Sequence, residues 1–266
     1  MQFTKMCGCG NDFIVIDNRQ GLLGGGIAEF AQKHCARRTG VGADGILLIE
    51  ASDSADFRMR TINADGSEAE MCGNGGRCVA RFALARGMAP ASMKFETLAG
   101  PVEAEVHAEA VTIGMGGTSV VQAEKKLEVN GETVMVHPIE AGVPHAIVFT
   151  GDVDGVAVDK LGRAIRMHPF FQPRGTNADF VQVVGPGRIR MRTYERGVEA
   201  ETPACGTGAI ASAIVSHLRR DAGGPPIKVV VRGGLLTVDF TVEDDRIQNV
   251  RLSGEAIFVY EGQLPD

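Results

Sequence analysis

Short apolar runs separated by turn residues recur along the whole chain, and they predict a protein built mostly of β-strands. One run is divided by Asn130-Gly131, the dipeptide that favours a two-residue hairpin turn. The 35 glycines fit the many tight turns that such a fold needs. Strands are expected at 13–17, 45–49, 111–115, 126–136, 146–150, 180–184, 189–194, 227–231, 235–242 and 256–260.

Helical patterns are rarer than strand patterns. Apolar residues three and four apart predict a first helix, and Pro169 would stop another. Two further segments combine small and apolar residues at close intervals, as buried helices do. Helices are therefore expected over 27–34, from just after Cys72 toward Gly87, over 158–167, and from just after Cys205 toward Gly223.

Two segments, 59–78 and 191–211, read almost as copies of each other. Both begin Met-Arg-Thr, and each contains a cysteine, Cys72 or Cys205, that opens a Gly-rich turn. Other pairs of segments resemble each other more weakly, and they follow in the same order in both halves of the chain. The further pairs are 40–48 with 175–183 and 10–17 with 144–152.

This duplication predicts an α+β fold of two pseudo-symmetric domains. TIGMGGTS reads as a linker, so the boundary is expected at Gly116-Gly117. The first domain is predicted to cover 1–116 and the second 117–255, with a final strand within 256–266 that packs back on the first.

Composition narrows the function. A net charge of −6 without a basic run, no Trp and only two Tyr argue against nucleic acid and anionic membrane as partners. No run approaches the ~20 apolar residues of a membrane span. The first residues lack a secretory apolar region, so a cytoplasmic location and six reduced thiols are expected.

The duplicated cysteine motifs carry the candidate chemistry. In CGNGG and CGTGA, a sharp turn at a helix start exposes backbone N–H groups that can hold a carboxylate. The positive electrostatic potential of these N–H groups and of the helix N-terminus is also expected to lower the pKa of each thiol toward neutrality. Two thiols on opposite sides of one carbon could remove a proton from one face and deliver one to the other. Asp44 and Asp179 occupy matched turns, and we interpret them as turn caps.

The stretches NADGSEAEMCGNGGRC, RTYERGVEAETPACGTGA, GCGNDFIVID and GVGADGILL closely resemble the signatures of the diaminopimelate epimerase family, and the resemblance runs from Lys5 to about Tyr260. It implies a cofactor-independent epimerase that converts LL-2,6-diaminopimelate to the meso form, on the route to lysine and cell-wall peptide. It also implies two similar domains, each a strongly curved, mostly antiparallel sheet or barrel around a central helix, with the active site in the cleft between them.

The resemblance assigns roles position by position. Cys72 and Cys205 match the catalytic thiols, one a thiolate base and the other a thiol acid. Positions that bind the reacting end of the substrate are matched by Gly73, Asn74, Gly206 and Thr207. Positions that hold its amino and carboxylate groups are matched by Asn11, Asn63, Asn177, Glu195 and Arg196. His145 and Glu195 match residues that help the thiols to exchange protons.

The chain departs from the family pattern at three positions. Many members have Asn where this chain has Val143, Gln where it has Gly45, and His where it has Cys7. The first two lie at or near expected substrate contacts. Cys7 and Cys9 form a C-x-C pair without a second pair at metal spacing, so no metal is predicted.

Other functions compete with this interpretation. One is a racemase of the same fold that acts on histidine or a proline derivative, although proline-type relatives usually carry His where this chain has Asn74. Another is a redox sensor in which Cys72 and Cys205 form a switchable disulfide. A redox sensor or a plain binding module would leave the substrate-type residues unexplained. The expected partner is a small amino acid, and the sequence leaves open whether the protein forms a homodimer.

Overall fold

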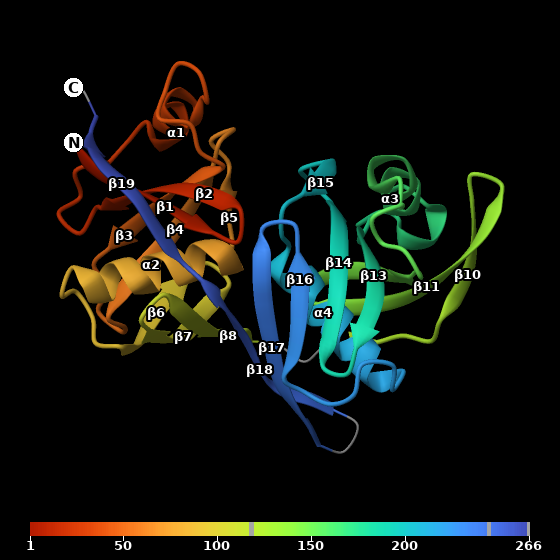
Figure 1. Cartoon of the computed structure of the whole chain (residues 1–266). Coiled ribbons are helices and arrows are strands. Elements are labelled where there is room, and N and C mark those ends of the chain that lie inside the picture. Colours follow the sequence, from red (N-terminus) through yellow and green to blue (C-terminus); the bar gives the residue numbers. More distant parts are fainter. Residues whose placement is uncertain (117–119, 244–245, 265–266) are drawn as a thin grey trace. The chain divides into compact units, whose positions relative to one another are not determined.

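The computed structural model describes the chain except residues 117–119, 244–245 and 265–266 (Figure 1). The chain divides into two compact units, Met1–Gly114 with Ser253–Asp266, and Met115–Leu252. Residue 117, where the second domain was predicted to begin, and the end of 256–266 lie outside the described residues. Strands predominate in both units and each contains two α-helices, so the predicted α+β class with two repeated domains is confirmed.

The first unit is a mostly antiparallel sheet with two helices. Its β1 lies between β2 and the C-terminal strand β19 and pairs with both (Figure 1). The Met1 amino group donates to the carbonyl of Leu264 at 3.0 Å. The elements are β1 (Gln2–Gly8), β2 (Asn11–Asp17), α1 (Ile27–Cys35), β3 (Gly45–Glu50), β4 (Phe57–Asn63), β5 (Glu68–Ala69), α2 (Gly73–Ala85), β6 (Ser92–Thr97), β7 (Gly100–His107), β8 (Ala110–Gly114) and β19 (Ile257–Gln263).

The second unit repeats this order. The elements are β9 (Val120–Val121), β10 (Lys125–Val129), β11 (Glu132–Ala141), β12 (Val143–Phe149), α3 (Val158–Arg166), the short 3₁₀-helix η1 (Pro169–Phe171), β13 (Asn177–Gly185), β14 (Arg188–Glu195), β15 (Ala200–Thr202), α4 (Gly206–Leu218), β16 (Ile227–Val231), β17 (Gly234–Glu243) and β18 (Arg246–Glu255). The last residues of β18 belong to the first unit.

Strand pairing follows the same scheme in both units. β2 runs parallel to β3, and β12 runs parallel to β13, with His145 opposite Asn177. β3 then pairs antiparallel with β4, as β13 does with β14. Further along, β4 runs parallel to β6 and β14 to β16. The duplicated sequence therefore folds into a duplicated topology.

Each unit buries its parallel strand pair between two helices. In the first unit, the side chains of Ile14 and Ile46 pack with those of α1 in one apolar cluster. The opposite face meets α2, where a Cβ on Gly75 would lie 2.9 Å from the Leu47 side chain. Covering on both faces explains why these strands read as continuous apolar runs rather than as alternating ones.

The four predicted helices are confirmed, and α2 and α4 begin directly after Cys72 and Cys205. The strand prediction is incomplete. It omitted β1, β4, β6, β7 and β18, and also the short strands β5, β9 and β15. In β7 and β18, buried and exposed residues mostly alternate, and many of the exposed residues are charged. Such strands depend on their neighbours more than on their own hydrophobicity.

No helix along 1–116, 120–243 and 246–264 is long and apolar enough to cross a bilayer.

Candidate active site

Cys72 stands at the N-cap of α2, in the first unit. Its backbone is extended, and its sulfur accepts a hydrogen bond from the N–H of Gly75 at 3.4 Å. The glycines that follow allow the chain to turn into the helix while α2 packs closely on β3. The half-buried thiol therefore lies beside the free backbone N–H groups of the first helical turn, where an anion is stabilised.

A chain of hydrogen bonds links α2 to the start of β2. The Asn74 amide donates to the Asn11 side-chain oxygen at 2.5 Å, and the Asn11 amide donates to Asp44 at 2.9 Å. Arg77, which is fully buried, donates to the side-chain oxygen of Asn74 at 2.8 Å. This chain fixes the orientation of both asparagines, which were predicted to bind substrate.

Cys205 stands at the equivalent position, the N-cap of α4, and accepts a hydrogen bond from the N–H of Gly208 at 3.4 Å. Burial, and then the nearby carboxylates of Glu195 and Asp179, raise the pKa of this thiol well above its usual value. The expectation that the helix terminus would lower it is wrong for Cys205. Hydrogen bonds from one helical turn do not offset the desolvation of a thiolate buried between two carboxylates.

Glu195 lies at the end of β14, beside Cys205. It accepts hydrogen bonds from the Thr202 hydroxyl, at 2.5 Å, and from the Cys205 thiol. Burial raises the pKa of this carboxyl group, the hydrogen bond from Thr202 opposes the rise, and the charge of Asp179 adds to it. A raised pKa makes this carboxyl group a better proton acceptor than an ordinary glutamate.

His145 is almost fully buried in β12 and has hydrogen-bond partners at both ring nitrogens. Its Nδ1 lies 2.6 Å from Asp179, and its Nε2 lies 3.0 Å from the Thr207 hydroxyl. The Thr207 hydroxyl is in turn 3.4 Å from the sulfur of Cys205. The structure thus connects a predicted proton-transfer residue to a predicted catalytic thiol.

Asn177 and Arg196 lie at the edge of this group. The Arg196 backbone N–H donates to the side-chain oxygen of Asn177 at 2.7 Å, while its guanidinium donates to the carbonyl of Arg174 at 3.1 Å. The remaining guanidinium N–H groups can grip a carboxylate. The second unit therefore brings together Cys205, Gly206, Thr207, His145, Asn177, Glu195 and Arg196.

The first unit brings together Cys72, Gly73, Asn74 and Asn11. Asn63 lies apart from this hydrogen-bonded group, exposed at the end of β4, where its amide donates to Ser67 at 3.0 Å. Gly45, one of the departures from the family pattern, begins β3, and a Cβ there would lie 2.7 Å from the carbonyl oxygen of Ile62. This backbone therefore leaves no room for a larger residue at position 45.

Asp179 was misinterpreted as a turn cap. It lies within β13 and is fully buried. The signal was present in the sequence, because a carboxylate directly before the apolar run 180–184 has to be buried with that strand. Arg77 was also missed, although a charged residue among the small and apolar residues of a buried helix indicates a polar partner inside the unit.

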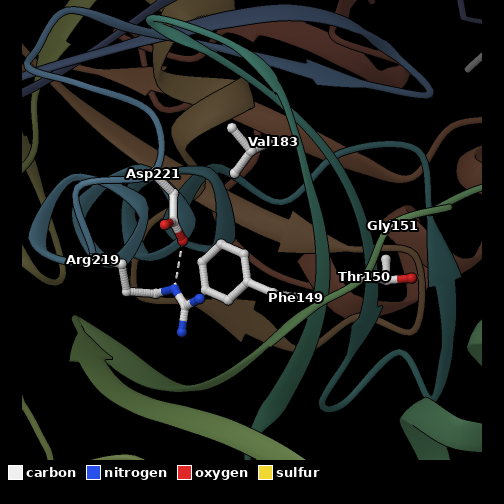
Figure 2. Close-up of a pocket in the computed structure, with 6 residues that line it drawn as sticks. All are labelled: Phe149, Thr150, Gly151, Val183, Arg219 and Asp221. Carbon is white, nitrogen blue, oxygen red and sulfur yellow. Dashed lines mark hydrogen bonds and ion pairs between the residues drawn. The ribbon is translucent and has the colours of Figure 1, made fainter.

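The described residues of the second unit enclose hollows of two sizes. The larger, of about 430 Å³, is shown in Figure 2, where the Arg219 guanidinium lies over the Phe149 ring at 4.3 Å and pairs with Asp221 at 2.6 Å. None of the predicted site residues lines it. The smaller, of about 110 Å³, is lined by His145 together with Pro144, Ile139 and the aromatic residues of η1. Among the described residues, no cluster of His, Cys, Asp or Glu is arranged to hold a metal ion.

Solved structures of low sequence identity share the fold. A phenazine biosynthesis protein of the PhzF family from Bacillus anthracis superimposes with a TM-score of 0.77 at 17% identity, covering 100% of this chain and 99% of that one. A probable proline racemase from Agrobacterium radiobacter gives 0.72 at 17% identity, covering 99% and 92%.

Curated relatives are much closer in sequence. The diaminopimelate epimerase of Aquifex aeolicus is 48% identical over 100% of this chain and 98% of its own length. That of Archaeoglobus fulgidus is 41% identical over 98% and 95%. The family model for diaminopimelate epimerase matches residues 3–121 and 138–259. The chain therefore belongs to the diaminopimelate epimerase family.

Proposed function

We propose that this protein interconverts LL-2,6-diaminopimelate and meso-2,6-diaminopimelate by proton transfer at the α-carbon, without a cofactor. The observation that carries the proposal is the pair of thiols, each at the N-cap of a central helix, one in each of two repeated units. Full-length relatives named diaminopimelate epimerase support the choice of substrate. The reaction belongs to the route to lysine and peptidoglycan precursors, and we place the enzyme in the cytoplasm.

In this mechanism the thiolate of one cysteine removes the α-proton, and the thiol of the other delivers a proton to the opposite face. The charge passes from one sulfur to the other, and the α-carbon is inverted. Because burial and two carboxylates disfavour its ionised form, Cys205 is the thiol acid in the direction in which Cys72 is the thiolate base, and the two roles are exchanged in the reverse direction.

The α-hydrogen of an amino acid is a weak acid, so the site must stabilise the developing carbanion. We propose that backbone N–H groups of Gly73, Asn74, Gly206 and Thr207 hold the carboxylate at the reacting end. These groups belong to the first turns of α2 and α4, beside the two sulfurs. Asn11, Asn63, Asn177, Glu195 and Arg196 then hold the amino and carboxylate groups of the substrate.

The direct test is turnover of purified protein. LL-diaminopimelate, meso-diaminopimelate, L-histidine and trans-4-hydroxy-L-proline are each incubated with the enzyme, and the stereoisomers are separated chromatographically. We expect conversion of the two diaminopimelates alone. Efficient inversion of histidine or hydroxyproline without diaminopimelate would replace the proposal by the rival racemase.

Arg196 provides a test of substrate binding. Lysine keeps the charge but loses the planar, two-pronged grip on a carboxylate, so we expect Arg196→Lys to lower kcat/KM well over tenfold. Arg190 forms an exposed ion pair with Asp154 at 2.7 Å, and Arg190→Lys serves as the matched control with unchanged kcat/KM. Equal kinetics for both variants would place Arg196 outside the site.

A further inference from the structure

Asp179 is a fully buried carboxylate at the centre of the second unit. One of its oxygens accepts from the Thr193 hydroxyl at 2.7 Å, and the other faces His145 at 2.6 Å. A Cβ on Gly208 would lie 2.5 Å from Asp179, so only glycine lets the first turn of α4 approach it. Burying a carboxylate costs folding free energy unless hydrogen-bond partners stabilise its charge. Residues of two strands and of α4 surround Asp179.

The hydrogen bonds around His145 determine which ring nitrogen carries the proton. The Arg196 backbone N–H donates to the Asn177 side-chain oxygen at 2.7 Å, so the NH₂ group of Asn177 must be the end that faces His145. That group lies 3.4 Å from Nε2. Nε2 therefore presents a lone pair, and the ring proton is on Nδ1, where it is donated to Asp179.

The direction of the remaining bonds follows. Thr207 has one hydroxyl proton, and it must donate that proton to Nε2, at 3.0 Å. The Cys205 thiol has one proton and two neighbouring acceptors, Glu195 and the Thr207 oxygen, which lies 3.4 Å from the sulfur. When this proton turns away from Glu195, the Thr207 oxygen accepts it. The donors of Thr207 and His145 thus point toward Asp179, and the Cys205 thiol joins them when its proton faces Thr207.

We propose that Asp179 is a positioning residue that holds His145 in the Nδ1–H form and thereby orients a proton path between Cys205 and His145 through the Thr207 hydroxyl. The inference rests on the proposed function of Cys205. When Cys205 is to act as the base, its proton moves to the Thr207 oxygen while the proton of Thr207 moves to Nε2. The products are a thiolate and an imidazolium, and the charge of the imidazolium is balanced by Asp179. Reversal of the same steps restores the thiol.

The first unit contains the same connection at the duplicated positions. There Asn74, Asn11 and Asp44 take the places of Thr207, His145 and Asp179, and the same two links are made, at 2.5 and 2.9 Å. The duplication thus preserves a donor chain that runs from the Gly-rich turn to an aspartate. Amide groups do not exchange protons as an imidazole does, so only the second unit can use this chain as a proton path.

The experiment combines NMR with kinetics. Protein labelled with ¹⁵N-histidine reports the protonation of each ring nitrogen, and His145→Gln identifies the His145 signals. We expect wild-type His145 to be protonated at Nδ1 alone, and Asp179→Asn to lose this preference.

The Asp179→Asn variant should also have a kcat lower on the order of a hundredfold or more while KM changes little, because proton transfer and not binding is impaired. Thr207→Ser should retain at least tenfold more activity than Thr207→Val.

Two control variants separate positioning from general damage. Asp44→Asn removes the matched carboxylate of the first unit and should leave the His145 signals unchanged. Thr193→Val removes the other hydrogen bond to Asp179 and should lower the melting temperature without changing the protonation of His145. A wild-type His145 protonated at Nε2, or an Asp179→Asn enzyme with normal kcat and unaltered signals, would overturn the proposal. Failure of wild-type protein to act on diaminopimelate would instead refute the proposed function, since the NMR measurement needs no turnover.

Discussion

Replacing either Cys72 or Cys205 with alanine should abolish epimerisation in both directions, by about 10⁴-fold or more. Each cysteine caps one central helix, and each is the one thiol that the duplication places beside a Gly-rich turn. When one thiol is removed, the remaining thiol serves only one of the two faces of the substrate α-carbon. The two single variants should therefore lose similar amounts of activity. The double variant should lose little more than either one, because residues that act as a unit have non-additive effects.

Cys35 supplies the control for this experiment. It is buried in α1, and burial raises its pKa to about 11, so it is an inert packing residue. We expect Cys35→Ala to retain wild-type kcat, with at most a lower melting temperature from the lost packing. The measurement is kcat of each variant in both directions, and circular dichroism verifies that each variant is folded. Near-normal turnover by either Cys72→Ala or Cys205→Ala would contradict the two-thiol mechanism.

The sequence was sufficient for the features that depend on local pattern and repetition. All four helices were predicted because each buries small or apolar residues behind a clear start or stop, such as Cys72 or Pro169. β4 was omitted although its counterpart β14 was predicted, and a strict use of the repeat would have recovered it. β7 was omitted because its buried residues alternate with exposed ones and Pro101 interrupts it.

The sequence was less informative about the electrostatics of the site, in particular about the pKa of Cys205. Sequence motifs showed that Cys205 would cap a helix, which favours a thiolate. They did not show that Glu195 and Asp179 would lie close to the same sulfur, because these residues come from different strands. The balance between a helix terminus and two buried carboxylates depends on three-dimensional proximity. For the same reason Asp179 was interpreted from its turn-like neighbours and not from its partner, His145.

Isotope labelling should separate the two-thiol mechanism from a mechanism with one base. In deuterated water, product formed early from either epimer should carry one deuterium at the inverted carbon. The thiol that delivers the proton, Cys205 in one direction, has already exchanged with solvent before substrate binds. The measurement is mass spectrometry of product and remaining substrate during the first few per cent of conversion.

Unreacted substrate should carry almost no deuterium under the same conditions. A proton taken by one thiol either returns to the same face from that sulfur or stays behind while the other thiol completes inversion, and neither event labels the starting epimer. A single base that reached both faces would carry substrate hydrogen into product. Early product that is mostly unlabelled would therefore refute the two-thiol mechanism even if Cys72 and Cys205 both proved essential. Deuterated product with unlabelled substrate requires two separate proton carriers, and the two repeated units supply one thiol each.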